Sequence, residues 1–116
     1  MLNDVVDNDQ SFLPTTTAQH WEVDIPAALP VRLQTLDLAR HVAIAPDGKR
    51  YVVATFDDTR LERGFVTSIF PQQNGYLTLI RLTLYETQSQ TPQQAVELHI
   101  KIVEAIQQGK IKQFLK

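Results

Sequence analysis

The clearest periodic pattern of apolar residues lies near the C-terminal end of the chain and predicts one amphipathic helix. Thr91 is a suitable N-cap, Pro92 fits the first helical position, and Gln94 completes a capping-box pattern, while Gly109 supplies the stop. The apolar positions are Ala95, Val96, Leu98, Ile100, Ile102, Val103, Ala105 and Ile106. At about 100° per residue they spread over roughly 220°, which is about twice the arc that one sheet needs. We therefore expect two apolar neighbours for this helix: the sheet, and either another chain segment or a second subunit.

A β-hairpin is predicted immediately before the helix. Its arms are residues 65–70 and 76–85, both rich in β-branched and aromatic residues. Asn74-Gly75 lies between them and is typical of a tight turn, because both turn positions require positive φ. Apolar residues occur on both faces of the second arm, so we expect it to be an interior strand, with or without a bulge.

A second hairpin is predicted from residues 41–45 and 50–56, joined by the turn Pro46-Asp47-Gly48-Lys49. Upstream, residues 20–25 alternate strictly between apolar and polar, which predicts a half-buried strand that ends at Pro26. Residues 26–40 contain two prolines and favour a connection with a short helical turn. The charged residues 57–64 favour a loop between the hairpins.

Together these elements predict an α+β fold. We expect a twisted antiparallel sheet of about five strands in a meander, with one C-terminal helix packed across one face. Residues 20–116 would form this single domain, and residues 1–19 are polar and turn-rich, as in an N-terminal arm.

Composition narrows the functional classes only slightly. The 116 residues are 43% hydrophobic and 21% charged, with a net charge of −2 and no cysteine, which excludes disulfides and thiol catalysis. Without an apolar run of about 20 residues or a signal-peptide pattern, we expect a soluble, cytoplasmic protein with no membrane partner.

Candidate catalytic chemistry is limited to Asp57 and Asp58, which could act with His20 or His41. Adjacent residues at a strand end point in opposite directions, and the histidines lack the spacing of metal ligands. Turn-stabilising roles for the two aspartates are the more common use of this residue type. No catalytic, cofactor or metal site is therefore predicted, and an enzyme is the third choice.

Nucleic-acid binding is the second choice. Five basic residues could form an anion-binding stripe beside aromatic residues on the sheet, as in single-strand binders: Lys49, Arg50, Arg60, Arg63 and Arg81. The aromatic candidates are Tyr51, Phe56, Phe65 and Tyr76. The order of four strands and a helix also resembles that of Whirly-type single-strand-binding proteins, although the acidic net charge favours a solvated face instead.

A non-enzymatic interaction module is the first choice. One helix cannot cover both faces of the sheet and also bury its own wide apolar arc, and exposed apolar patches usually mark interfaces. We therefore expect self-association, as a dimer or higher oligomer, through the C-terminal helix and the sheet face that it leaves bare. The predicted interface residues are Val96, His99, Ile100 and Val103. His99 is predicted to be a satisfied core or interface histidine, or alternatively a pH-sensitive contact.

Overall fold

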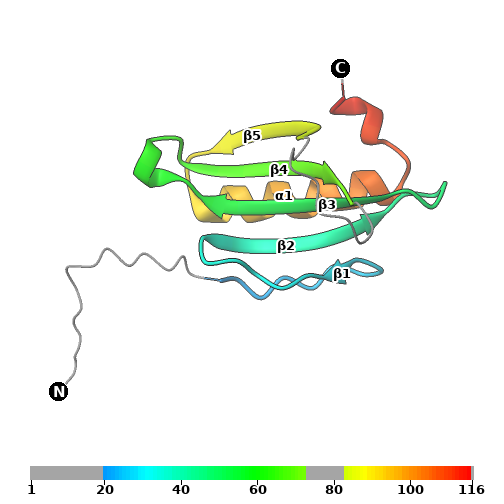
Figure 1. The fold of residues 1–116 in the computed structure, drawn as a ribbon, viewed down its shortest axis with the longest axis horizontal. Coiled ribbons are helices and arrows are strands. Elements are labelled where there is room, and N and C mark those ends of the chain that lie inside the picture. The colour runs from blue at the N-terminus through cyan, green and yellow to red at the C-terminus, as the bar shows by residue number, and fades with distance from the viewer. Residues whose placement is uncertain (1–19, 73–82, 116) are drawn as a thin grey trace.

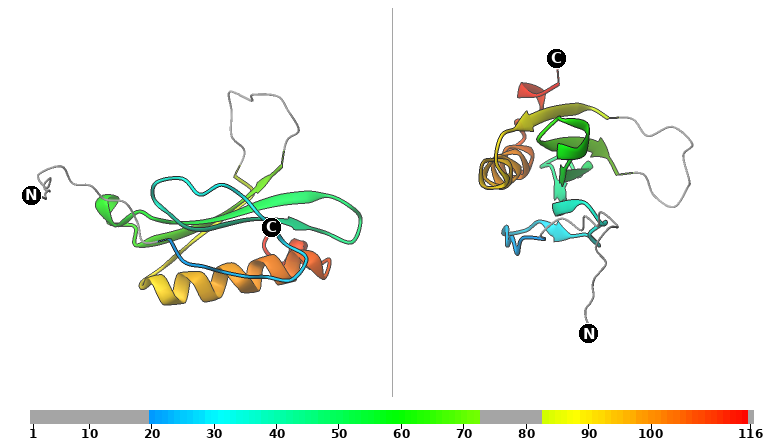
Figure 2. Two further views of the ribbon diagram at one scale, coloured as in Figure 1. Left: turned by 90° about the horizontal axis from the view of Figure 1, so that it is seen from below. Right: turned by 90° about the vertical axis from the view of Figure 1, so that its left-hand side faces the viewer.

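The computed structural model describes residues 20–72 and 83–115, which form an antiparallel five-stranded meander with one α-helix (Figure 1). The strands follow one another across the sheet in chain order, and the helix packs on one face (Figure 2). This arrangement confirms the predicted α+β fold. The elements are β1 (Leu29–Pro30), β2 (Asp37–Ile44), β3 (Arg50–Asp57), the short 3-10 helix η1 (Thr59–Leu61), β4 (Phe65–Pro71), β5 (Tyr85–Ser89), α1 (Pro92–Gln107) and the short 3-10 helix η2 (Ile111–Gln113).

The ends of α1 follow the predicted capping chemistry. Gln94 N donates to Thr91 Oγ1 over 3.1 Å, as predicted, whereas the Gln94 side chain accepts from the backbone N–H of Gln90 and not from that of Thr91. Gly109 follows the helix with a φ of +79°, a conformation that costs glycine little. Local sequence signals therefore fix both the position and the length of α1.

The main core lies between α1 and the facing side of the sheet. Ile102, Val103 and Ile106 of α1 are fully buried against Val53 of β3 and Ile69 of β4. Burying each such aliphatic side chain is worth about 1.5–3 kcal/mol. This layer therefore supplies a large part of the stability of the fold.

Two chain segments provide the second apolar neighbour that the wide arc of α1 requires. Ile25, in the segment before β1, and Ile111, in η2, are buried in the same core as α1. Gln107 Nε2 also donates to the Pro26 carbonyl over 2.8 Å. Figure 2 shows the segment before β1 on the same side of the sheet as α1. Of the two alternatives, chain segment or second subunit, the structure thus supplies the first.

The predicted strand at residues 20–25 is wrong as secondary structure, although its alternating burial is correct. Trp21 N donates to Leu38 O over 2.9 Å, whereas the Val23 carbonyl is bonded to the side chain of His41. A side chain therefore takes the place of a backbone partner, and no regular ladder forms along β2.

The predicted helical turn before residue 40 is also wrong. Residues 29–30 form β1, and β2 begins at Asp37 rather than at residue 41. Pairing of Asp37 with Phe56, and a bulge before Ala39, extend the strand. Arg40 Nε bonds Asp37 Oδ2 across this bulge at 2.8 Å. Tertiary pairing here overrides a weak local preference.

The two predicted hairpins have different outcomes. The turn between β2 and β3 forms as predicted, with Gly48 at a φ of +90° and Asp47 Oδ1 accepting from Lys49 N. The Asn74-Gly75 turn, Arg81 and most of the arm 76–85 lie outside the described residues.

On the side away from β3, the strand that pairs with β4 is not the predicted interior strand at residues 76–85. It is β5, an edge strand that shares only Tyr85 with the predicted arm. Ile69 of β4 pairs with Tyr85. A two-residue turn at Asn74-Gly75 would instead require Ile69 to pair with Ile80. Along β5, exposed residues (Glu86 and Gln88) alternate with partly buried ones (Tyr85 and Thr87). This pattern is typical of an edge strand with one solvent-exposed face.

Candidate functional site

A continuous chain of hydrogen bonds between polar side chains crosses the core beneath α1. His99 of α1 bonds His41 of β2 through Nε2 and Nδ1 at 2.9 Å, and its own Nδ1 lies 2.9 Å from Thr55 Oγ1 of β3. Thr55 Oγ1 lies 2.8 Å from Thr67 Oγ1 of β4, and His41 Nε2 lies 3.1 Å from the Val23 carbonyl. One network therefore joins β2, β3 and β4 to α1 and to the segment before β1.

The direction of the donors follows from the Val23 carbonyl, which can only accept. His41 therefore donates from Nε2 and accepts at Nδ1, so His99 must donate from Nε2. His99 Nδ1 then accepts from the Thr55 hydroxyl, which in turn accepts from Thr67. Every ring nitrogen is satisfied when both histidines are neutral.

Burial favours the neutral form of both histidines. Desolvation, followed by the neighbouring His41, lowers the pKa of His99 from 6.5 to about 3. Burial also lowers the pKa of His41, and the Val23 carbonyl and the charge of Asp24 partly offset this effect. His99 is thus a satisfied core histidine, and the predicted pH-sensitive role within the cellular range is not supported.

The predicted interface residues lie mostly within the core. Val96 is 5% exposed, and His99 and Val103 are 0% exposed, whereas Ile100 is only partly buried. The chain itself therefore covers three of these four side chains. In the part of the chain that the structure describes, self-association would need a different surface.

The predicted acidic pair serves local structure. Asp57 Oδ1 accepts from Thr59 N over 2.9 Å and from Thr59 Oγ1 over 2.6 Å. Asp58 Oδ2 accepts from Arg63 Nε over 2.6 Å. His20 is an exposed residue at the start of the described chain, and His41 belongs to the core network. Across the described ranges, no three His, Asp or Glu side chains gather as metal ligands.

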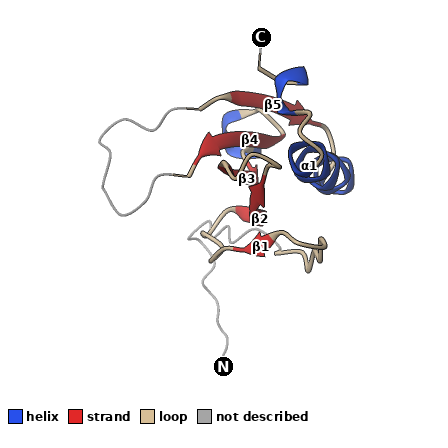
Figure 3. Cartoon of the chain, turned by 90° about the vertical axis from the view of Figure 1, so that its right-hand side faces the viewer, coloured by secondary structure: helices blue, strands red, loops and turns tan. Residues whose placement is uncertain are grey.

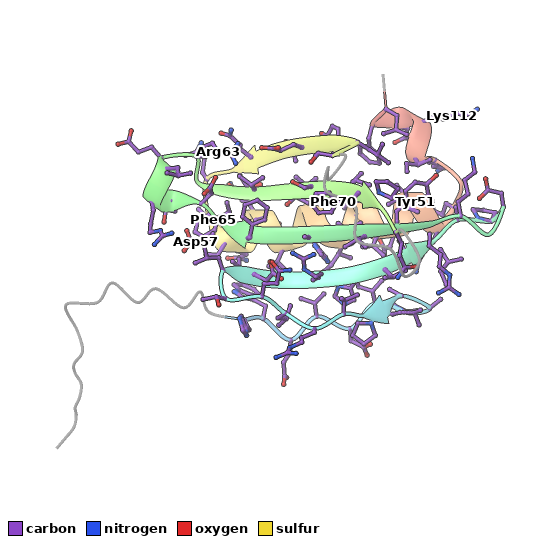
Figure 4. The ribbon with its side chains drawn as sticks, in the orientation of Figure 1. Tyr51, Asp57, Arg63, Phe65, Phe70 and Lys112 are labelled. Carbon is purple, nitrogen blue, oxygen red and sulfur yellow. The ribbon has the colours of Figure 1, made fainter. Side chains whose placement is uncertain are left out.

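The predicted basic stripe is divided between the two ends of the sheet. Lys49 and Arg50 lie where β3 begins, whereas Arg60 and Arg63 follow its end. Arg63 is also paired with two carboxylates, those of Asp58 and Glu86. Figure 4 shows Arg63 at the opposite end of the sheet from Tyr51. The described basic residues therefore do not form one continuous track.

The aromatic candidates are also divided. Tyr51 packs against the core beneath α1, and Phe65 shares its side of the sheet, because strand residues alternate and Thr67 also faces α1. Phe56 points to the opposite face, since its neighbour Thr55 bonds His99. No observation on the described residues favours single-strand binding.

The sheet face opposite α1 is another candidate surface. Alternation places Ile44 of β2, with Val52 and Phe56 of β3, on this face, and all three side chains are half-buried. We call these three residues the open-face rim. Figure 3 shows α1 on the other side of the stacked strands. The rim is therefore apolar surface that α1 cannot cover.

A groove of about 490 Å³ lies on the same face. Arg40, Ser68 and Glu86 form part of its floor, because the strand register places them in one row across the sheet with Ala54. Its remaining lining residues are Gln34, Thr35, Leu36, Asp37, Phe56, Phe70 and Thr83. The groove has a mixed aromatic and polar lining, and the open-face rim adjoins it through Phe56.

Sequence reasoning did not identify a second cavity, of about 510 Å³, beside the outer edge of β2. Residues 21–24 supply one wall, Pro30, Val31 and Leu33 supply another, and His41 also lines it. Trp21 lines this cavity and also a smaller one, and its Nε1 is buried without a hydrogen-bond partner among the described residues, which costs about 1–3 kcal/mol. No sequence pattern predicted that two irregular segments would meet at this edge.

No family model, curated protein or solved structure matches this chain. Within residues 20–72 and 83–115, no helix is both long and apolar enough to cross a bilayer.

Proposed function

We propose that this protein is a non-enzymatic interaction module that self-associates through the sheet face opposite α1. The observation that carries the proposal is the open-face rim: Ile44, Val52 and Phe56 are half-buried apolar side chains on a face that α1 does not cover. Apolar surface of this kind is stabilised when a partner excludes water from it. Unlike the interface expected from the sequence, the proposed contact surface does not include α1, because most of the apolar residues of α1 already pack within the chain.

Charge pairing on this face supports a second copy as the partner. Arg40 is bonded to Asp37 at 2.8 Å, and Glu86 is bonded to Arg63 at 2.7 Å. These pairs leave no net charge from the four residues. These four residues therefore add no like-charge repulsion between two identical faces, and the unpaired charge that alternation places beside Ile44 is that of Arg50.

The size of the face predicts a weak dimer. Strands β2 to β5 span roughly 19 Å across, and the eight residues of β2 run for roughly 26 Å. Each copy would bury roughly 500 Å², giving roughly 1,000 Å² for the pair, which is near the lower limit of specific interfaces. We therefore expect the dissociation constant of the dimer to be micromolar or higher.

Light scattering over a concentration series tests the proposal. Wild type should change from monomer to dimer as its concentration rises, and Val52→Lys should remain monomeric, because two buried ammonium groups would meet at the contact. Leu61→Lys is the matched control: Leu61 is 69% exposed in η1, away from the open-face rim. It should dimerise like wild type.

A charge-reversal experiment separates a lost contact from a damaged fold. Val52→Glu should also be monomeric alone, but an equimolar mixture with Val52→Lys should recover mixed dimers through opposite charge. A wild type that stays monomeric at millimolar concentration would contradict the proposal. A Val52→Lys variant that dimerises normally would contradict it equally.

A further inference from the structure

We propose that the outer edge of β5 binds an extended peptide as an additional antiparallel strand, with alternate apolar side chains of the peptide facing the α1 side. Figure 1 shows β5 as the outermost strand at this end of the described sheet. The edge is separate from the open-face rim, so the inference does not rest on the proposed self-association.

The strand register leaves the backbone groups of Glu86 and Gln88 pointing away from the sheet. Gln72 N donates to Arg50 O over 3.1 Å, and bonded residues alternate along a strand, so the even-numbered residues of β4 bond β3. Glu86 and Gln88 lie opposite two of these even-numbered residues, which have no backbone groups left for β5. Among the described residues, no other backbone group bonds Glu86 or Gln88. Their two N–H and two C=O groups therefore remain open for pairing.

An extended polypeptide presents donors and acceptors at the spacing of these four groups. One added strand would satisfy all of them with four hydrogen bonds. Edges that resist such pairing usually carry proline or unpaired charges, especially lysine. The only charged residue of β5 is Glu86, and its carboxylate is bonded to Arg63 at 2.7 Å. The edge is therefore open to a partner strand.

An apolar ledge lies on the α1 side of this edge. It consists of four partly buried side chains, Tyr85, Leu98, Phe114 and Leu115, which pack against the core. The rings of Tyr85 and Phe114 are 5.2 Å apart. Leu98 lies nine positions before Gln107, so it is on the flank of α1 opposite the one that bonds the segment before β1. Apolar side chains on the α1 side of an added strand would cover this ledge.

The ledge favours a different polypeptide over a second copy of β5. Alternation places Tyr85, Thr87 and Ser89 on the α1 side of β5, because their partner Ile69 belongs to the core beneath α1 and Thr67 bonds the buried network. A second β5 would therefore bring two small hydroxyl side chains to the ledge. A segment with valine at alternate positions would bury more apolar surface there.

Uncharged seven-residue peptides with blocked ends test these features by NMR titration. In the first peptide, valine alternates with threonine. It should shift the amide proton resonances of Glu86 and Gln88 downfield in a saturable manner, because both N–H groups gain an acceptor. A second peptide, with serine in place of each valine, should bind roughly fivefold more weakly or worse.

N-methylation of the peptide separates strand pairing from apolar contact. With the valines facing the α1 side, the threonines lie opposite Glu86 and Gln88 and exchange hydrogen bonds with them. N-methylating the threonines should therefore weaken binding roughly tenfold or more. N-methylating the valines instead should leave the affinity within about threefold, because those N–H groups point away from β5.

Two variants of one residue test the edge itself, with the Glu86 amide as the reporter. Gln88→Pro removes an N–H that bonds no other described backbone group, and proline is tolerated on edge strands, so the fold should persist and binding should weaken roughly fivefold or more. Gln88→Ala is the matched control, because it keeps the N–H, and it should bind within about twofold of wild type. Val52→Lys, on the open-face rim, should bind like wild type.

The wild-type titrations do not depend on any variant folding. Amide resonances of Glu86 and Gln88 that do not respond to the valine peptide would overturn the proposal. Equal affinities for the two N-methylated peptides would overturn strand pairing, and equal affinities for the valine and serine peptides would overturn the role of the ledge. Shifts of the same two amides on concentrating the protein alone would identify a second copy as the occupant and would also overturn the proposal.

Discussion

The two faces of the sheet differ in how completely their side chains are covered. Beneath α1, even His99 and Thr55 are fully buried, and each is hydrogen-bonded. On the opposite face, Val42, Ala54 and Val66 are also buried, but the apolar residues Ile44, Val52 and Phe56 are only half-buried. Residue type alone therefore does not decide which side chains are covered. The positions of α1 and of the segments around residues 25 and 111 decide it for the face beneath α1, and the half-buried residues of the other face carry the proposed contact.

The largest expected difference between the faces is in the free energy of unfolding that is lost when one side chain on each face is truncated. Ile102→Ala should lower the free energy of unfolding by about 2–5 kcal/mol, because Ile102 is fully buried beneath the sheet. Val52→Ala should cost less than about 1 kcal/mol at concentrations where the protein is monomeric. Urea denaturation measures both values. Similar losses for the two variants would show that the faces are equally packed.

The buried network should make stability depend on pH. His99 has a folded pKa of about 3, below the unfolded value of about 6.5, so its contribution is complete above pH 6.5 and is lost as the pH falls. Between pH 6.5 and 5 the expected loss is about 2 kcal/mol, at about 1.4 kcal/mol per pH unit. His99→Leu should reduce this slope, measured by urea denaturation at each pH, and leave the part that the lowered pKa of His41 contributes. His20→Gln, which changes an exposed histidine, is the matched control and should retain it.

The smallest expected effect concerns the end of the helix that covers one face. Thr91→Ala should reduce stability by about 1 kcal/mol, because Thr91 Oγ1 accepts from Gln94 N. Thr91→Ser keeps an acceptor and should lose only a fraction of this amount. Thermal unfolding of the two variants tests the cap. Equal melting temperatures for Thr91→Ala and wild type would exclude a stabilising role.

Local signals explain which parts of the fold could be predicted. Thr91, Pro92 and Gly109 define α1, and the turn at residues 46–49 defines the hairpin of β2 and β3. Each depends on residues a few positions apart, so the sequence contains the necessary information. The start of β2 at Asp37 depends instead on pairing with Phe56, nineteen positions away, and no local pattern indicates it.

The candidate sites depend even more on distant contacts. The sequence singled out His99 as a polar residue within an apolar arc, but its partners Thr55 and His41 come from two different strands. The cavity at the β2 edge depends on how residues 21–24 and 30–33 meet the strand. Alternation correctly predicted which residues of 20–25 are buried, yet it could not show that a side chain replaces the backbone partner of Val23.

The most direct test of the difference between the faces is an NMR dilution series followed residue by residue. Self-association through the open face predicts concentration-dependent shifts at the backbone amides of Ile44, Val52 and Phe56, with Ile102 and His99 of α1 unchanged. Shifts confined to α1, or the absence of any shift up to millimolar concentration, would contradict the account.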